Sequence, residues 1–426
     1  MIEVKIVKES IFEETPVGRI PKDWKSKKVL DLFTVETGTT PSTKRKDFWS
    51  GGTINWITPT DLSKLDNHIQ IKSSGRKITD KALKETNLTL IPKGSIILST
   101  RAPVGYVAVI ENPATFNQGC KGLVSRNPLT ISPHFYGYYL STKKQALQNL
   151  SSGSTFLELS KERLAQFSVP YPPVADQIGA VRIIETVDSA IELTNNVVKK
   201  TERLKKGLMQ QLLTHGIGHT EYKFSKELGT EIPIEWHVVR AGQICRPIVP
   251  GRNKPRKFDG DIPWITLPDI QGIEISESKS GLNITMEEIA ECGNKLVPAQ
   301  SVIMNCIGEF GVVGIATKDI VLNQQLHAFV CPDNVDPYFL ALCLMSQVKY
   351  MQSVSTKTVV PYMNKENCNS VPIPLPALDE QKKIAEIISE ADRKIDVEKR
   401  EKAKLEKIKH GLMDLLLTGK VRIKVD

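Results

Sequence analysis

Apolar and polar positions repeat with two different periods along this chain. Short runs rich in β-branched residues, at 54–58, 94–100 and 105–110, are separated by Gly, Pro and Asn turns, which is typical of strands. Residues 134–150 and 337–352 read as helices at matching places in two halves of the chain. The pattern therefore predicts globular parts of mixed α and β structure, each with a twisted sheet and peripheral helices.

Two longer stretches carry a helical period. Between Ala180 and Leu212, and again between Ile384 and Leu416, apolar or small residues recur mostly at steps of three or four. Proline-rich segments precede both stretches and favour an extended backbone before a helix start. A continuous helix over 176–214 would be roughly 58 Å long at 1.5 Å per residue. Residues at this spacing form one apolar face on each helix. Because each helix would bury this face against a partner helix, we expect the two helices to pair as an antiparallel coiled coil.

The chain contains an internal repeat. Residues 170–214 align without gaps on residues 374–418, with 16 of 45 positions identical, and end in GLMQQLLT and GLMDLLLT. The blocks IPKDW and WITPTDL of the first copy return as IPIEW and WITLPDI in the second. A period near 200 residues makes each copy a domain in its own right. We predict an α+β protein of two similar mixed α/β domains, each followed by a long helix, with segments 1–170, 171–218, 219–374 and 375–426.

Each of the two predicted helices carries a glycine at the same place in the repeat, Gly207 and Gly411. A glycine in a helix interior costs about 1 kcal/mol relative to alanine. Two interpretations are open: a close approach of another backbone, or a glycine that the helix merely tolerates.

Charge and cysteine usage narrow the class of protein. Lys and Arg exceed Asp and Glu by 57 to 48, a formal net charge of +9, which favours a polyanionic partner. The seven cysteines contain no C-x-x-C pair, which favours a reducing compartment. No run of about 18 apolar residues and no signal-peptide pattern occurs in the sequence. We expect a cytoplasmic protein without membrane contact.

The duplicated order of motifs resembles the specificity subunit of Type I restriction-modification systems. The resemblance rests on IPKDW and IPIEW, the WITPTDL block, STRAPVGYVAV with FNQGC (within 99–120), and the twin proline-led helices ending GLMxxLLT. It implies two target recognition domains, each reading one half of an interrupted double-stranded DNA site, on a helical spacer whose length sets the number of unread base pairs. It also implies methylation subunits as partners, with two expected, and restriction subunits in the full complex. The second copy has NCIGEFGVVGIA (305–316) where the first has STRAPVGY, which suggests a different half-site.

No catalytic role is expected. The methyltransferase loop of type N-P-P-[YF] and the phosphate-binding G-x-x-x-x-G-K-[ST] loop are both missing, and no zinc-ligand spacing occurs. Pro268, Asp269, Glu277 and Lys279 form a chance match to a nuclease pattern that the first copy lacks. We predict no cofactor and no metal.

Candidate DNA contacts come from two basic loops at matching places, 39–46 and 250–257, and from neighbouring turns. Arg and Lys neutralise phosphates or bind guanine edges, and amides suit adenine. The predicted DNA-binding residues are Thr39, Thr40, Lys44, Arg45, Lys46, Arg101, Gln118, Lys121, Arg252, Asn253, Lys254, Arg256, Lys257, Asn305 and Gln324.

Simpler roles compete with these assignments. The basic loops could be solvated surface, Arg101 could bind a carboxylate in a structural turn, and the amides could form turns. The Ser/Thr-rich segments 151–160 and 353–363 could bind phosphate, but a helix-capping loop is the favoured interpretation. Trp56 and Trp264 are assigned to the core rather than to base stacking. The alternative function for the whole chain is a coiled-coil protein scaffold that does not read DNA sequence.

Overall fold

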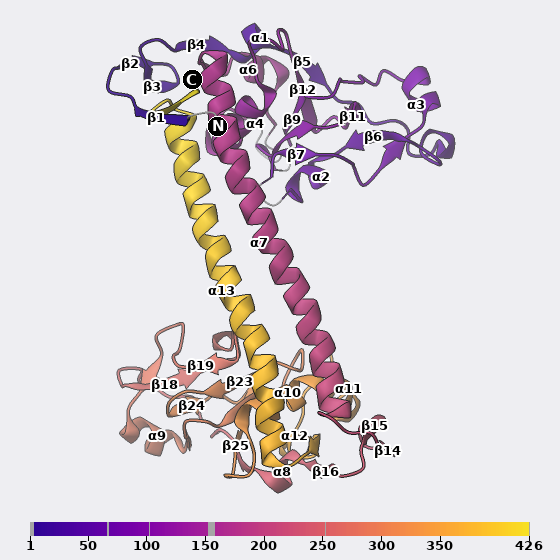
Figure 1. The fold of residues 1–426 in the computed structure, drawn as a ribbon, viewed down its shortest axis with the longest axis vertical. Helices are drawn as coiled ribbons and strands as arrows, with labels where there is room; N and C mark the ends of the chain where they lie inside the picture. The colour runs from indigo at the N-terminus through magenta and orange to yellow at the C-terminus, as the bar shows by residue number, and fades with distance from the viewer. Residues whose placement is uncertain (1–3, 66–67, 102, 152–157, 252, 426) are drawn as a thin grey trace. The chain divides into compact units, whose positions relative to one another are not determined.

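The computed structural model describes every residue except 1–3, 66–67, 102, 152–157, 252 and 426 (Figure 1). It contains two compact units, the first formed by Met1–Asn195 and Arg400–Asp426 and the second by Asn196–Lys399. Each unit therefore combines one globular part with a portion of each long helix. The boundaries at 170, 218 and 374 remain predictions from the sequence repeat.

The first unit is built on a five-stranded sheet with the order β5-β12-β9-β10-β7. All neighbours are antiparallel except β10 and β7, which are parallel. A three-stranded sheet, β11-β6-β8, completes the globular part. The strands are β5 (Phe33–Thr37), β6 (Ile54–Ile57), β7 (Gln70–Ile71), β8 (Lys77–Ile78), β9 (Ile96–Ser99), β10 (Val107–Ile110), β11 (Ala114–Phe116) and β12 (Cys120–Ser125).

The second unit repeats this plan. Its five-stranded sheet has the order β17-β25-β22-β23-β19, again with one parallel pair at the β19 edge, beside a four-stranded sheet β20-β18-β24-β21. The strands are β17 (Arg246–Ile248), β18 (Ile262–Ile265), β19 (Glu274–Ile275), β20 (Asn283–Ile284), β21 (Leu296–Val297), β22 (Val302–Asn305), β23 (Val313–Ala316), β24 (Ile320–Leu322) and β25 (Leu326–Val330). The repeat and the predicted mixed α/β class are both confirmed.

Two-stranded sheets and short helices accompany these sheets in both units. The paired strands are β1 (Val4–Lys8) with β27 (Val421–Val425), β2 (Phe12–Thr15) with β3 (Gly18–Pro21), β4 (Lys25–Lys28) with β13 (Ser168–Tyr171), β14 (Tyr222–Ser225) with β15 (Thr230–Pro233), and β16 (His237–Arg240) with β26 (Pro372–Leu375). The short helices are α1 (Val29–Leu32), η1 (Lys46–Phe48), α2 (Pro59–Ser63), α3 (Asp80–Glu85), α6 (Lys161–Ala165), α8 (Ala241–Ile244), η2 (Leu267–Asp269), α9 (Met286–Cys292) and α12 (Lys365–Asn369).

The two predicted core helices are each broken into two. Residues 134–150 form α4 (Pro133–Thr142) and α5 (Lys144–Asn149), and residues 337–352 form α10 (Pro337–Ser346) and α11 (Val348–Val354). The break falls at Lys143 and at Gln347, whose backbones leave the helical region at ψ values of 17° and 22°. Six consecutive residues of α4 and six of α10 are buried, which confirms their place in the core.

The long helices α7 (Val174–His215) and α13 (Leu378–Leu416) begin directly after the proline-rich segments, as predicted. A glutamine in the first turn of each helix explains the shared motif. The Gln177 amide oxygen accepts the Ser132 N–H, and Gln381 accepts the Asp336 N–H in the same way, at 2.8 and 2.9 Å. Both glutamines also donate to a carbonyl oxygen of the preceding proline-rich segment. Each long helix is thereby tied to the N-terminus of its unit's core helix, α4 or α10.

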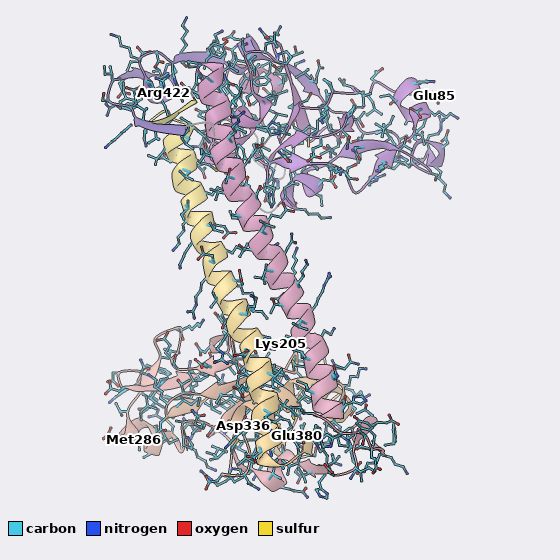
Figure 2. The ribbon with its side chains drawn as sticks, in the orientation of Figure 1. Glu85, Lys205, Met286, Asp336, Glu380 and Arg422 are labelled. Carbon is cyan, nitrogen blue, oxygen red and sulfur yellow. The ribbon has the colours of Figure 1, made fainter. Side chains whose placement is uncertain are left out.

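Within each unit α7 and α13 run antiparallel and are joined by charged side chains. In the first unit Asp188 of α7 binds Lys409 of α13, and Asn195 accepts from Lys402. In the second unit Lys205 binds Asp392, at 2.6 Å (Figure 2). A tyrosine hydroxyl donates a hydrogen bond to the aspartate of each ion pair. Tyr138 donates to Asp188 and Tyr338 donates to Asp392, both at 2.6 Å.

The helix glycines are tolerated rather than required. A Cβ atom added at Gly207 or at Gly411 would meet no atom within 4 Å, so the interpretation as a close backbone approach is wrong. The close approach in the first unit is instead at Gly179, where an added Cβ would lie 2.9 Å from Ile423 of β27. That contact fixes the C-terminal strand against the start of α7.

Candidate nucleic-acid interface

The first basic loop, 39–46, connects β5 to η1 and is anchored by two indoles. The Trp56 Nε1–H donates to the Thr39 carbonyl oxygen at 3.0 Å, and the Trp49 Nε1–H donates to Ser42 O at 3.1 Å. Trp56 is 3% exposed, which confirms its assignment to the core. The tryptophans therefore fix the loop's path, while the side chains of Lys44 and Lys46 extend into solvent.

Arg45 differs from the two lysines beside it because acidic groups already bind it. Its guanidinium forms ion pairs with Asp47 at 2.6 Å and Glu85 at 3.0 Å and lies over the Phe48 ring. The Arg45 contact, followed by Lys81, holds the pKa of the Asp47 carboxyl well below its usual range. Lys44 and Lys46 have no ion pair with any residue that the structure describes, so their charges are available to an anion.

A turn at 117–119 lies against this loop. Gln118 accepts a hydrogen bond from the Thr40 hydroxyl, and both side chains are exposed. Asn117 uses its amide oxygen to accept the Gly119 N–H at 3.0 Å, so it is a turn-former. A Cβ added at Gly119 would lie 3.7 Å from Cβ of Arg101, which places the arginine beside the turn. The structure thus brings Thr40, Gln118 and Arg101 together.

Arg101 and Lys121 are less available than the sequence suggested. Arg101 pairs with Glu158 at 2.8 Å, as its alternative structural role requires, although the arginine side chain remains 45% exposed. Lys121 lies within β12 and is 5% exposed, and burial lowers the pKa of its ammonium group. Little of the Lys121 side chain is exposed, and its contact with DNA stays a prediction.

The second basic loop, 250–257, is anchored by polar groups rather than by indoles. The Glu288 carboxylate at the start of α9 accepts the Arg256 backbone N–H at 2.5 Å, and this contact lowers the pKa of Glu288. Asn294 accepts the Gly251 N–H at 3.0 Å. The side chains that the loop exposes are Asn253, Lys254, Arg256 and Lys257, whereas Arg252 lies outside the described residues. Trp264, beneath the loop, is 5% exposed and belongs to the core, as predicted.

A turn also meets the second loop. The exposed Gln324 side chain donates to the Gly251 carbonyl oxygen at 2.9 Å, in the place where Gln118 meets Thr40 in the first unit. Asn305, another predicted DNA-binding residue, has a structural role in this unit. It is fully buried, and its amide donates to the carbonyls of Ile307 and Glu309 and accepts the Val312 N–H. Its hydrogen bonds hold the 305–312 loop, and its contact with DNA stays a prediction.

Arg76 is an exposed arginine beside the first basic loop that the sequence analysis did not include among the candidate DNA contacts. Its guanidinium stacks 3.7 Å from the centroid of the Trp49 ring and 5.1 Å from that of Trp56, on the surface beside the first basic loop. Arg76 lies outside both loops, and only the fold brings it next to the tryptophans. No sequence signal marked it.

The chance nuclease match has a structural explanation. The Asp269 carboxylate is 5% exposed and accepts hydrogen bonds from the Thr266 backbone and hydroxyl and from the Lys279 N–H. Asp61 makes the same bonds to Thr58 in the first unit. The next-to-last residue of the shared block, WITPTDL or WITLPDI, is thus a capping aspartate. Among the residues that the structure describes, no three His, Cys, Asp or Glu side chains are grouped to hold a metal ion.

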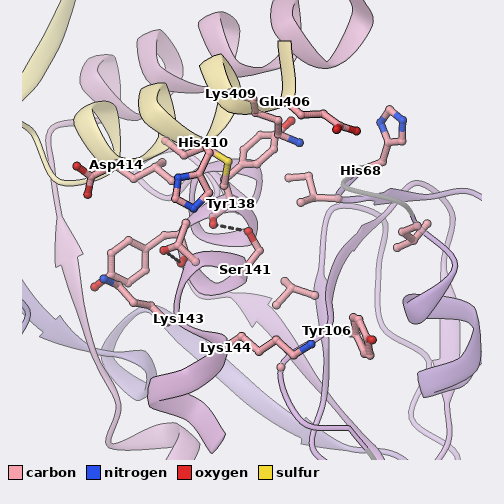
Figure 3. A pocket seen from close by; sticks show the side chains of 18 of the residues that line it. His68, Tyr106, Tyr138, Ser141, Lys143, Lys144, Glu406, Lys409, His410 and Asp414 are labelled. Atoms are coloured by element: carbon pink, nitrogen blue, oxygen red, sulfur yellow. Dashed lines mark hydrogen bonds between the residues drawn. The ribbon is translucent and has the colours of Figure 1, made fainter. Parts of the chain in front are cut away.

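The first unit also has a groove of about 1030 Å³ away from these loops (Figure 3). It is lined by the end of α4, the start of α5 and α13, with Lys143, Lys144, Lys407 and His410 among its side chains. None of the predicted DNA contacts lines it.

No helix in the described part of the chain is long and apolar enough to cross a membrane.

Comparison with known proteins identifies the family. A family model described as the Type I restriction modification DNA specificity domain matches residues 21–203 and 233–407. The specificity subunit of the Type I restriction enzyme MjaIX from Methanocaldococcus jannaschii is 31% identical across 99% of this chain and 98% of that protein. The putative MjaX specificity subunit from the same organism is 27% identical over the full length of both.

The solved structures agree on the fold. The crystal structure of the S subunit of a Type I restriction-modification system from M. genitalium superposes with a TM-score of 0.58 at 15% sequence identity, covering 92% of this chain and 96% of that one. A structure from a study of complex assembly and conformational transition in a type I system gives a TM-score of 0.56 at 17% identity. The chain belongs to the family of Type I restriction-modification specificity subunits.

Proposed function

We propose that this chain is the DNA sequence-specificity subunit of a Type I restriction-modification complex and that each unit reads one half of an interrupted target. The observation that carries the proposal is the equivalent construction of the two candidate interfaces. In each unit an exposed basic loop lies against a glutamine-bearing turn, through Thr40 and Gln118 or through Gly251 and Gln324. Lysine and arginine side chains bind phosphates, and amide and guanidinium groups form hydrogen bonds with base edges.

The proposed partners follow from the relatives, which are named as subunits of restriction enzymes. We propose that methylation subunits, two per chain, and restriction subunits join this chain on double-stranded DNA. The chain itself would supply recognition and no reacting group. Purified chain given DNA and a methyl donor is then expected to leave the DNA unmethylated.

The test is genome-wide mapping of methylated bases in a methylation-negative host. The host expresses the cognate methylation subunit either alone or together with this chain. An interrupted motif that appears only when the chain is present is the expected result. If the complex assembles and the methylation subunit is competent but no motif appears, the proposal is wrong.

A further inference from the structure

An apolar tip protrudes from the second unit between α11 and α12. Within residues 355–363, Val359 is 102% exposed, Val360 54% and Tyr362 47%. Single exposed apolar side chains are ordinary on protein surfaces, but three in one short loop call for a partner.

Hydrogen bonds within the loop hold these side chains outward. The Thr356 N–H donates to the Tyr362 carbonyl oxygen at 3.0 Å, and the Tyr362 N–H donates back to the Thr356 hydroxyl at 3.1 Å. The Thr358 hydroxyl donates to Val360 O at 2.7 Å. Because these hydroxyls serve the loop itself, phosphate binding through them is not what the loop is built for. The exposed valine side chains are the groups that the loop offers to a ligand.

The tip is continuous with the candidate interface of the second unit. The Met363 N–H donates to Cys306 O and the Gly308 N–H donates to Pro361 O, both at 2.8 Å. The Cys306 N–H in turn donates to Gln325 O at 2.9 Å, beside the Gln324 that holds the basic loop. Backbone hydrogen bonds therefore join the tip, the 305–312 loop and the glutamine turn into one surface.

The first unit has the same backbone connections but different side chains. The Leu159 N–H donates to Thr100 O and the Thr100 N–H donates to Gly119 O, in the places of Met363, Cys306 and Gln325. An isolated antiparallel β-bridge of the backbone joins Arg101 to Glu158 in the first unit. The equivalent β-bridge in the second unit joins Ile307 to Tyr362. The oppositely charged residues at this place in the first unit are thus replaced by an isoleucine and a tyrosine in the second, so the two units present different chemistry to their ligands.

We propose that the 355–362 loop is a base-contacting element of the second unit and that Val359 and Val360 pack against thymine methyl groups in the major groove. This inference rests on the proposed function and names what the second unit reads. The thymine C5-methyl is the one apolar group that the major groove displays, and apolar side chains are its usual partners. DNA is the occupant because the tip is continuous with a surface that carries Lys254, Arg256 and Lys257.

The experiment uses the chain assembled with its cognate methylation subunit, after the motif has been mapped. Affinity is measured for duplexes in which deoxyuridine replaces thymine in one half-site at a time, which removes only the methyl group. For the unaltered chain we expect a loss of about fourfold per contacted methyl in the half-site of the second unit. The double variant Val359→Ser, Val360→Ser removes the methyl groups of both side chains from this exposed loop and is expected to bind both duplexes equally.

Matched controls separate the outcomes. Deoxyuridine in the other half-site should lower the affinity of both proteins by the same factor. The variant Val397→Ser, at a 63% exposed valine on α13, should behave as the unaltered chain. The inference is overturned if the half-site has no thymine, if the double variant keeps the deoxyuridine penalty, or if it fails to assemble with the methylation subunit, which would make the tip a protein contact. Failure of the proposed function looks different, since the unaltered chain would then yield no motif.

Discussion

Adjacent basic residues of the first loop differ in how strongly the protein already neutralises them. Lys44 has no ion pair among the described residues, whereas Arg45 is bound by Asp47 and Glu85. Each phosphate contact contributes about one to the slope of log affinity against log salt. We predict that Lys44→Ala lowers this slope by about one, and that Arg45→Ala lowers it by less, because two carboxylates offset its charge. Binding isotherms over a range of salt concentrations measure both slopes.

The control for this comparison is Arg19→Ala. Arg19 is exposed on β3 of the same unit and pairs with Glu14, with its side chain 70% exposed. Its removal should leave the slope unchanged. A slope that responds equally to Arg19 and Lys44 would mean that overall charge, and not the loop, governs binding.

His327 gives the second unit a pH dependence. It is 2% exposed within β25 and bonds to Asn369, and burial lowers the pKa of its imidazole to about 4. The folded pKa lies below the unfolded value of about 6.5, so the unfolded chain binds the proton first as pH falls. The stabilisation is complete above pH 6.5 and is lost as pH falls toward 4, by roughly 3 kcal/mol.

The variant His327→Gln can retain a bond to Asn369 and has no ionisable group. We predict that the free energy of unfolding, measured by urea denaturation at pH 7 and at pH 4, falls more for the unaltered chain than for the variant. The expected excess is a few kcal/mol. Equal pH dependence of the two proteins would show that folding does not lower the pKa of His327.

At the scale of elements, the two helix-pairing clusters differ in burial. Lys409 and Asp188 of the first unit have side chains 7% and 11% exposed, whereas Lys205 and Asp392 of the second are 21% and 22% exposed. Removing one partner of a buried pair leaves an uncompensated charge and costs about 3–5 kcal/mol, while a solvated pair contributes less. We therefore predict that Lys409→Met destabilises the first unit more than Lys205→Met destabilises the second.

Hydrogen exchange separates the two effects, because the amides of α4 report on the first unit and those of α10 on the second. Lys409→Met should accelerate exchange in α4 with α10 unchanged. Comparable acceleration by both substitutions in their own units would show that solvent screens the two pairs equally.

Elements with a strong period were predictable, and long-range contacts were not. The apolar stripe and the proline-rich starts placed α7 and α13 within a few residues of their observed bounds. The breaks at Lys143 and Gln347 were missed, because the apolar pattern continues through both. The burial of Lys121 and Asn305 could not be predicted, because it depends on parts of the chain that are distant in sequence. Arg76 was missed for the same reason, since its stacking depends on tryptophans brought to it by the fold.

At the scale of the whole molecule, the two copies of the internal repeat share the same fold but differ in the residues at their candidate interfaces. The strand order of the five-stranded sheet is the same in both units, and the helix-start glutamines form the same hydrogen bonds. The surface residues have diverged: Arg101 and Glu158 form an ion pair in the first unit, and Ile307 and Tyr362 stand at the same backbone bridge in the second. Divergence on a repeated scaffold lets one chain present two different reading surfaces.

The units should therefore contribute independently to binding. Lys44 belongs to the first unit and Lys254 to the second, and the two share no partner among the described residues. Effects of substitutions without shared partners add to within about 0.5 kcal/mol. We predict that the binding free-energy losses for Lys44→Ala and Lys254→Ala sum to that of the double variant, measured on DNA carrying both half-sites at fixed salt. A double variant much weaker or stronger than the sum would show that occupation of one half-site alters the other, and reading would then be cooperative.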